Sequence, residues 1–183
     1  MNLAPVFKEI MLPPNIIEYL DGSSNFARGT TSSAKGKESP VRSTDICFRD
    51  QEDWVGKFCR HHVQVINEDF FKYHLNDGFD NGKYQYAHYH VNDHYGWHQD
   101  NIPDLPWDRK LSFSLLLNDD YQGGHLEFVE PLYEGDLRWN INRIKVTAGL
   151  LVVFPSMLGH RVTPVTKGIR KSIVGWCVGR QFT

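Results

Sequence analysis

Three residues of metal-binding types stand out by their spacing. His98 and Asp100 are two positions apart in the segment GWHQD, and His160 ends a later apolar run, LLVVFPSMLGH. In an extended segment, residues i and i+2 point to the same side, so the imidazole of His98 and the carboxylate of Asp100 can reach one metal ion. His160 would then supply a third ligand from another part of the fold.

Two imidazoles and one carboxylate on one face of a metal leave coordination positions open, which is the arrangement of non-haem Fe(II) oxygenases. A structural zinc site would instead be closed by four protein ligands. Arg170 follows His160 by ten positions, at the start of the strand-like run RKSIVGWCVGR. Its guanidinium keeps its charge and can hold a carboxylate with two hydrogen bonds, so the sequence predicts an anion site beside the metal.

The patterns around these residues predict a mainly β fold with flanking helices. Apolar residues recur at three- and four-residue steps over 51–74, which predicts one long helix, and a short helix is predicted over 13–20. Residues 22–44 are rich in Gly, Ser, Thr and Lys and predict a flexible loop, and turns are expected at 76–78, 81–82 and 123–124. β-branched or alternating runs predict strands within the ranges 83–91, 110–118, 124–130, 141–155, 162–168 and 170–180.

Composition limits the domain organisation, the binding partners and the cysteine chemistry that the chain can have. The 183 residues, 40% of them hydrophobic, are enough for one core, so a single domain over 1–183 is expected, with 1–75 as a helical support. The formal charge of −2 gives no overall attraction to nucleic acid or to a membrane. Three widely spaced cysteines indicate neither a disulfide framework nor a thiolate zinc site, and the start of the chain does not read as a secretory signal. A cytoplasmic protein is predicted, and its oligomeric state is left open.

A resemblance sharpens this interpretation. The segments YHVNDHYGWHQD, RKLS, YQGGHLEF and GLLVVFPSMLGHRVTPVTKGIRKSIVGW together resemble the 2-oxoglutarate/Fe(II) dioxygenase superfamily, in particular its prolyl 4-hydroxylase-like branch with the PKHD-type proteins. The resemblance implies a double-stranded β-helix (jelly roll) over 84–178. It also implies a set of site residues: Fe(II) on His98, Asp100 and His160; 2-oxoglutarate on Arg170, Tyr89 and Ser112; substrate near Tyr95 and Trp176. Trp97 is bulky for its place beside His98, and it is expected to narrow the substrate pocket or to stack on a substrate ring.

The resemblance implies hydroxylation of a C–H bond with release of succinate and carbon dioxide, and it admits ascorbate as a reductant. A prolyl residue of a protein or peptide is the leading substrate, and a free amino acid or small metabolite is the alternative. A nucleobase demethylase is disfavoured because the chain shows no basic nucleic-acid surface. A catalytically silent, cupin-like binding module is the alternative outside enzymes, and the presence of all three ligand types together with Arg170 argues against it.

Overall fold

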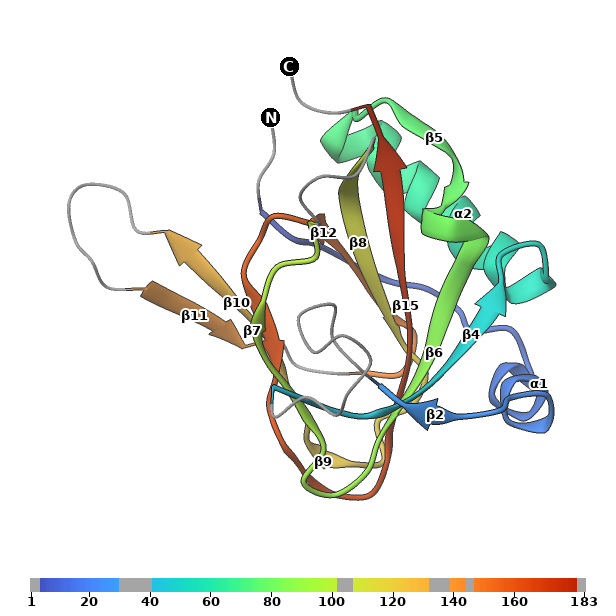
Figure 1. Cartoon of the computed structure of the whole chain (residues 1–183), viewed down its shortest axis with the longest axis vertical. Helices are drawn as coiled ribbons and strands as arrows, with labels where there is room; N and C mark the ends of the chain where they lie inside the picture. Colours follow the sequence, from blue (N-terminus) through green and yellow to red (C-terminus); the bar gives the residue numbers. More distant parts are fainter. Residues whose placement is uncertain (1–3, 30–40, 102–106, 132–138, 144–146, 181–183) are drawn as a thin grey trace.

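The computed structural model describes residues 4–29, 41–101, 107–131, 139–143 and 147–180. Its named strands pair antiparallel throughout and form a jelly roll (Figure 1). The large sheet has eight strands. In spatial order these are β1 (Val6–Glu9), β12 (Leu150–Pro155), β8 (Asp108–Leu116), β15 (Arg170–Gly179), β6 (Lys83–Tyr89), β4 (Asp45–Asp50) and β2 (Ala27–Arg28), with β5 (Leu75–Phe79) also paired to β15.

The second sheet carries His98 and His160. It has five strands, in the order β11 (Trp139–Arg143), β10 (Leu126–Pro131), β13 (His160–Val162), β7 (His94–His98) and β3 (Arg42–Ser43). Two further short strands, β14 (Val165–Lys167) and β9 (Gln122–Gly123), pair with each other. The register of β13 against β7 places His160 directly opposite His98.

The alternation of side chains along the strands of the large sheet separates two cores. Leu151 and Val153 of β12 belong to a cluster that packs under the helices, whereas Val152 and Phe154 belong to a second cluster shared with the five-stranded sheet. This second cluster contains side chains from both sheets, such as Phe128 of β10, so it fills the space between them. Because successive residues of a strand face opposite sides, every second residue of β6, β8 and β15 also faces this interior.

Two helices lie on the outer side of the large sheet (Figure 1). They are α1 (Ile16–Gly22) and α2 (Trp54–Ile66), and α2 continues into the π-helical turn η2 (Asn67–Phe71). The buried residues of α2 follow one face, with Val55, Cys59, Val63 and Ile66 against the core. The helical region ends at Phe71, and Lys72 follows with a φ of 58°. The side-chain amide of Asn67 then holds the backbone of Tyr73, donating to its carbonyl oxygen at 2.9 Å and accepting from its amide at 3.0 Å.

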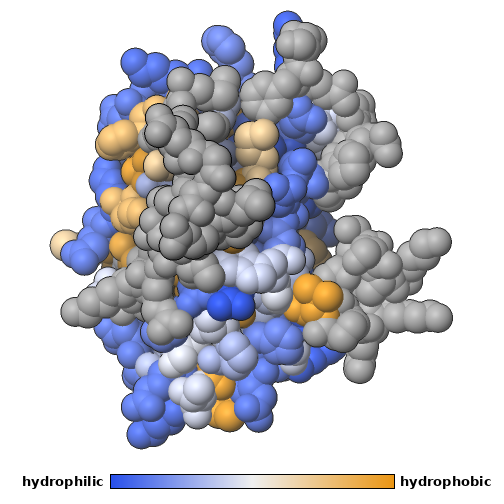
Figure 2. All heavy atoms as spheres, turned by 90° about the vertical axis from the view of Figure 1, so that its left-hand side faces the viewer, coloured by the Kyte–Doolittle hydropathy of each residue, from blue (hydrophilic) through white to orange (hydrophobic). Residues whose placement is uncertain are grey.

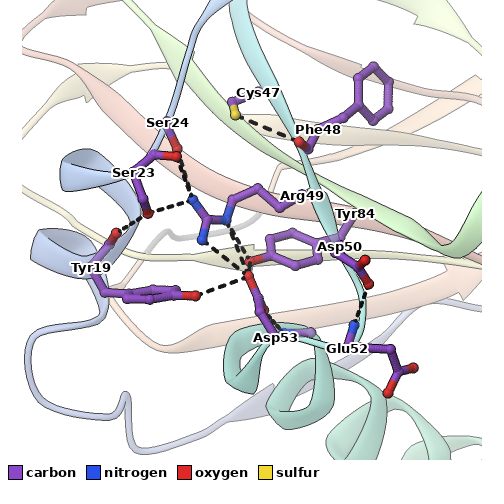
Figure 3. A network of polar contacts seen from close by, with 11 residues as sticks. Tyr19, Ser23, Ser24, Cys47, Phe48, Arg49, Asp50, Glu52, Asp53 and Tyr84 are labelled. Carbon is purple, nitrogen blue, oxygen red and sulfur yellow. Dashed lines mark hydrogen bonds and ion pairs between the residues drawn. The ribbon is translucent and has the colours of Figure 1, made fainter.

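A polar network fixes the start of α2 (Figure 3). Asp53 is the N-cap, and its carboxylate accepts a hydrogen bond from the Gly56 amide at 2.8 Å. The same side chain accepts from the Tyr84 hydroxyl at 2.7 Å and from the Arg49 guanidinium at 3.2 Å. The Arg49 guanidinium also donates to Ser23 after α1, so this network ties both helices to strands β4 and β6.

Most predicted elements are confirmed, including the long helix, the short helix and strands in all six predicted ranges. The helical description of 1–75 is incomplete, however, because the four strands β1, β2, β3 and β4 lie in this part of the chain and β5 begins at its end. These strands are short, and pairing with distant strands stabilises them: β1 pairs with β12 and β4 pairs with β6. Within the predicted loop 22–44, β2 and β3 are ordered, and residues 30–40 lie outside the described ranges.

The predicted turn at 76–78 is wrong. These residues belong to β5, which pairs with β15. Tertiary pairing therefore overrides a sequence with strong turn propensity, and Gly78 accommodates the strand with a φ of 90°. The next segment does turn, as predicted, because η3 (Asp80–Gly82) contains Asn81 and Gly82 with φ values of 55° and 65°.

On the face seen in Figure 2, hydrophobic residues occur as small separate patches among hydrophilic ones. No helix in the described part of the chain is long and apolar enough to cross a membrane.

The Asp53 network yields the first prediction. Asp53→Ala removes the helix cap and leaves the Tyr84 hydroxyl and the Arg49 guanidinium short of an acceptor, so the free energy of unfolding should fall by about 2–4 kcal/mol. Urea denaturation followed by circular dichroism measures it. Asp50→Ala is the matched control, since this exposed carboxylate bonds only the Glu52 amide among the described residues and its loss should cost about 0.5 kcal/mol. Equal losses in the two variants would contradict this role of the network.

Candidate metal and anion site

The three predicted metal ligands lie together between the two sheets. His98 is the last residue of β7, His160 is the first residue of β13, and Asp100 lies two residues beyond the end of β7. One ligand atom of each side chain lies within 4.8 Å of the other two. The Asp100 carboxylate is 3.6 Å from His98 Nε2 and 3.4 Å from His160 Nε2. Two nitrogen atoms and one carboxylate thus converge on a common point.

The opposite ring nitrogens fix the orientation of both imidazoles. His98 Nδ1 lies 2.8 Å from the Gly96 carbonyl oxygen, and His160 Nδ1 lies 2.9 Å from the Leu158 carbonyl oxygen. A carbonyl oxygen can only accept a hydrogen bond, so each Nδ1 carries the proton in the neutral ring. Each Nε2 is then left with a lone pair directed to the common point, which is the form in which histidine binds a metal.

The surroundings of His98 and Asp100 favour a neutral imidazole and an ionised carboxylate. Burial, together with the neighbouring His160, lowers the pKa of His98 and keeps its imidazole neutral. Burial alone would raise the pKa of Asp100, but the two imidazoles and hydrogen bonding outweigh it, and the pKa is lowered. An ionised carboxylate beside two neutral imidazoles forms a donor set that fits a divalent transition metal.

Arg170 is buried and lines the same cavity as the three metal ligands. Its side chain is only 1% exposed, its Nη1 donates to the Ser172 hydroxyl at 2.8 Å, and its guanidinium carbon lies 5.2 Å from the centre of the Tyr89 ring. Among the described residues no carboxylate forms an ion pair with it, and its Nε makes no hydrogen bond of standard geometry. A buried cation in this state provides a binding site for an anion.

The fold makes room for this arginine at one turn. Gly124 has a φ of 57°, and a Cβ atom there would lie 3.0 Å from Arg170 Cδ. Its neighbour Gly123 has a φ of 73° and no space for a Cβ, which would lie 2.3 Å from the Pro164 carbonyl oxygen. The predicted Gly-Gly turn is therefore confirmed, and it also clears space beside the buried guanidinium.

The metal ligands and Arg170 line one cavity of about 310 Å³. This volume is at the lower end of the range for small-molecule sites. Among the described residues, four cationic side chains and two carboxylates line it. The cations are Arg42, Lys83, Arg109 and Arg170, and the carboxylates are Asp80 and Asp100.

Comparison with known families agrees with this geometry. Residues 84–178, just over half of the chain, match the family model of the 2OG-Fe(II) oxygenase superfamily. The chain belongs to this superfamily. Fe(II) and 2-oxoglutarate are the cofactor and co-substrate that the family name states, and the His–Asp–His cluster fits the iron.

Within the superfamily, the chain is similar to PKHD-type hydroxylases. It is 41% identical over 88 residues to one from Synechococcus sp. (strain CC9902), and 40% identical over 90 residues to one from Hyphomonas neptunium. These matches cover 47% and 46% of this chain but only 36% and 37% of those proteins, so the chain aligns with little more than a third of their length.

Solved structures share the fold. A prolyl-4-hydroxylase from Pseudomonas putida has a TM-score of 0.68 at 24% identity, covering 99% of this chain and 94% of that one. A Trichoplax adhaerens prolyl hydroxylase, solved with a hypoxia-inducible-factor peptide fragment, has a TM-score of 0.72 at 17% identity, covering 94% of this chain and 82% of that one. The predicted jelly roll of a superfamily member is confirmed.

The three aromatic residues expected near the substrate differ in position. Tyr95 lines the cavity and stacks on the His98 ring, with centroids 3.5 Å apart, and Trp176 also lines the cavity. Trp97 does not face the cavity. Its ring lies under the Arg161 guanidinium, 4.7 Å away, and is 39% exposed. The described cavity lining does not include Trp97, and its expected role at the substrate pocket stays a prediction.

Tyr89 and Ser112, the two residues expected to assist Arg170, also differ in their position relative to the cavity. Tyr89 lines the cavity beside the guanidinium, where the resemblance places it. Ser112 instead lies by Asp100 and pairs with the Ser156 hydroxyl at 2.9 Å. Ser114, two residues further along the same face of β8, is the serine that lines the cavity. The co-substrate contact expected of Ser112 therefore stays a prediction.

Several cavity residues were missed by sequence reasoning. Arg109 forms an ion pair with Asp80 at 2.6 Å and lies over the Trp176 ring at 4.0 Å. Arg42 lies over the Tyr95 ring at 4.7 Å and donates to Gln85 at 3.0 Å. Arg109 belongs to the recognised segment RKLS and could have been found through it. Arg42 and Gln85 lie outside every recognised segment and meet only in the fold.

The convergence of the three ligands gives the second prediction. Alanine at His98, Asp100 or His160 should abolish binding of one equivalent of Mn(II), used as an air-stable substitute for Fe(II), because each side chain supplies one of only three protein bonds. Isothermal titration calorimetry measures it. His94→Ala is the control, since His94 lies on the same strand and its Nδ1 also contacts a carbonyl two residues earlier, that of Asn92. Wild-type affinity in all three ligand variants would show that the metal binds elsewhere.

Proposed function

We propose that the chain is an Fe(II)- and 2-oxoglutarate-dependent oxygenase that hydroxylates a C–H bond of a prolyl residue in a protein or peptide. One observation carries the proposal: a three-ligand cluster and a buried guanidinium without a carboxylate partner among the described residues line the same cavity. In this proposal residues 84–178 form the catalytic core and residues 1–75 support it.

Each residue then has a definite task. His98, Asp100 and His160 would hold the metal, with both imidazoles locked by their Nδ1–H bonds to the backbone. Arg170, stacked beside Tyr89, would pair with the distal carboxylate of 2-oxoglutarate and so direct its 2-oxo acid end toward the metal. Bound Fe(II) and 2-oxoglutarate would supply the activation of dioxygen, with succinate and carbon dioxide as co-products. The chain's own contribution is orientation and exclusion of water.

The substrate class rests on analogy and on the shape of the site. The similar proteins carry the names PKHD-type hydroxylase and prolyl hydroxylase. Beside the metal ligands, Tyr95 and Trp176 offer aromatic surfaces for an apolar ring.

A free amino acid or small carboxylate is the second candidate substrate, and the charge of the cavity favours it. Arg42, held by Gln85 and Tyr95, adds a cation on the side of the cavity next to His98. Stimulation of succinate release by free amino acids, and not by prolyl peptides, would select this class.

Arg170 gives the third prediction. Arg170→Ala should weaken 2-oxoglutarate binding about ten- to a hundredfold, since a charge-assisted bond is worth about 1.5–3 kcal/mol. Metal affinity should stay at the wild-type level, and Arg170→Lys should recover part of the loss because the charge survives without the two-bond geometry. The measurement is titration of 2-oxoglutarate into anaerobic Fe(II)-loaded protein, followed by the absorption of the chelate.

Arg161→Ala is the control for this titration. Arg161 is also an arginine of the site region, but its guanidinium pairs with Glu127 at 2.7 Å and faces Trp97, away from the cavity. Unchanged affinity in Arg170→Ala, or an equal loss in Arg161→Ala, would contradict the proposed role.

A further inference from the structure

A row of four side chains crosses the large sheet from β8 to β4, over strands that lie side by side (Figure 1). The strand register pairs Ser114 of β8 with Val174 of β15, Val174 with Gln85 of β6, and Gln85 with Phe48 of β4. Directly paired residues of neighbouring strands point to the same face, and all four of these side chains line the cavity of the metal ligands. The cavity therefore follows this cross-strand row toward the β4 side of the sheet.

The β8 end of the cross-strand row lies near the metal ligands. Ser112 is two residues from Ser114 on β8, and Phe154 of β12 pairs with Ser112. The Phe154 ring lies 4.7 Å from the ring of the metal ligand His160, measured between centroids. The row therefore begins beside the metal site.

The other end of the cross-strand row is open to solvent. Ser114 and Gln85 are 5% and 4% exposed, whereas Phe48 is 53% exposed. The edge strand β2 pairs with β4 at Asp45 and Ile46, so Phe48 lies beyond this pairing. The row thus leads from the buried metal site to an aromatic ring at the rim of the cavity.

Gln85 presents a hydrogen-bond donor in the middle of the row. Its Oε1 accepts a hydrogen bond from Arg42 Nη2 at 3.0 Å, and Arg42 lies over the Tyr95 ring. This bond fixes the orientation of the amide, whose Nε2 can only donate. Among the described residues, Gln85 Nε2 makes no hydrogen bond. A donor on a nearly buried side chain that lines a cavity is best satisfied by an acceptor of a bound ligand, such as a peptide carbonyl oxygen.

The length of the row sets the size of the molecule that fills it. Neighbouring strands lie about 4.8 Å apart, so the three spacings from Ser114 to Phe48 span about 14 Å. A polyproline-type or extended chain rises about 3.1–3.4 Å per residue and covers this distance with four or five residues. A free amino acid is a single residue and would leave most of the row unfilled.

We propose that the cross-strand row binds the peptide segment on one side of the hydroxylated residue. Gln85 donates to a backbone carbonyl oxygen of this segment, and Phe48 packs against a side chain about four residues from the hydroxylated one. A proline ring suits the aromatic face of Phe48, in the way that aromatic grooves bind proline-rich chains. The inference rests on the proposed function and deepens it, because it makes a peptide the substrate class.

The test uses proline oligomers of one to eight residues, capped at both ends so that terminal charges play no part. Succinate release is measured with saturating Fe(II) and 2-oxoglutarate. In the wild type, kcat/KM should rise with oligomer length and level off at about five residues. In Phe48→Ala, the ratio of kcat/KM for the eight-residue oligomer to that for the one-residue oligomer should fall about tenfold, the effect of losing a well-packed aromatic contact.

The ratio isolates the proposed contact, because damage to the metal or co-substrate site lowers both values together. Gln85→Glu keeps an oxygen that accepts from Arg42 but replaces the donor with a second acceptor, so it should lower the ratio about tenfold as well. Phe70→Ala is the matched control. Phe70 is also an exposed aromatic residue, at 51%, but it belongs to η2, which continues the helix α2 on the outer side of the sheet. This variant should keep the wild-type ratio.

A wild-type ratio in either Phe48→Ala or Gln85→Glu would overturn the inference, and so would an equal fall in Phe70→Ala. A wild-type kcat/KM that is the same for all oligomer lengths would also overturn it. Failure of the proposed function would look different. No oligomer of any length would then stimulate succinate release by the wild type, and the inference would fail together with the function on which it rests.

Discussion

A positive charge buried between two sheets is the constraint on which this site depends. The Arg170 side chain is 1% exposed, and the side chains described next to it, the Tyr89 ring and the Ser172 and Tyr121 hydroxyls, are neutral. An isolated ion in a protein interior costs several kcal/mol, so this arrangement persists only where an anion can enter or where other interactions over-determine the fold. The long strand β15 holds Arg170 in this position. It pairs with β8 along most of its length and with β6 from Arg170 to Val174.

The alternation of side chains along β15 buries Arg170 and also decides which other residues of this strand line the cavity. Arg170, Val174 and Trp176 line the cavity from β15, while Ile173 belongs to the core under the helices. The metal cluster is built from the opposite sheet, where the register of β13 against β7 sets His160 against His98. The arginine that would hold the anion and the histidines that would hold the metal therefore belong to different sheets. The jelly roll brings them into one cavity.

Sequence reasoning succeeded where local pattern decides the structure. The strands from 83 to 180 alternate or are β-branched, and the ligand spacing His98–Asp100 together with the later His160 indicated a metal site. It failed where tertiary pairing decides. Residues 76–78 have strong turn propensity, yet they lie within β5, which pairs with β15 through Leu75 and Phe79. The short strands β1 and β4 carry no clear pattern of their own and depend on distant partners, β12 and β6. The register of β7 shifts between Tyr95 and His98, so simple alternation along this strand does not decide which of Tyr95 and Trp97 faces the cavity. Ser112 and Ser114 share a face of β8, but Ser112 shares a hydrogen bond with Ser156 whereas Ser114 lines the cavity, a difference that the sequence pattern does not show.

The central claim is that the distal carboxylate of 2-oxoglutarate satisfies the charge of Arg170. The most direct test measures carbon dioxide release by the Fe(II)-loaded wild-type protein with 2-oxoglutarate and with 2-oxobutyrate, which keeps the metal-chelating 2-oxo acid but has no second carboxylate. The account predicts turnover with 2-oxoglutarate and at least tenfold lower kcat/KM with 2-oxobutyrate, in line with the loss of about 1.5–3 kcal/mol of charge-assisted bonding. Equal kcat/KM for the two oxo acids, or no release from 2-oxoglutarate by metal-loaded protein, would contradict it.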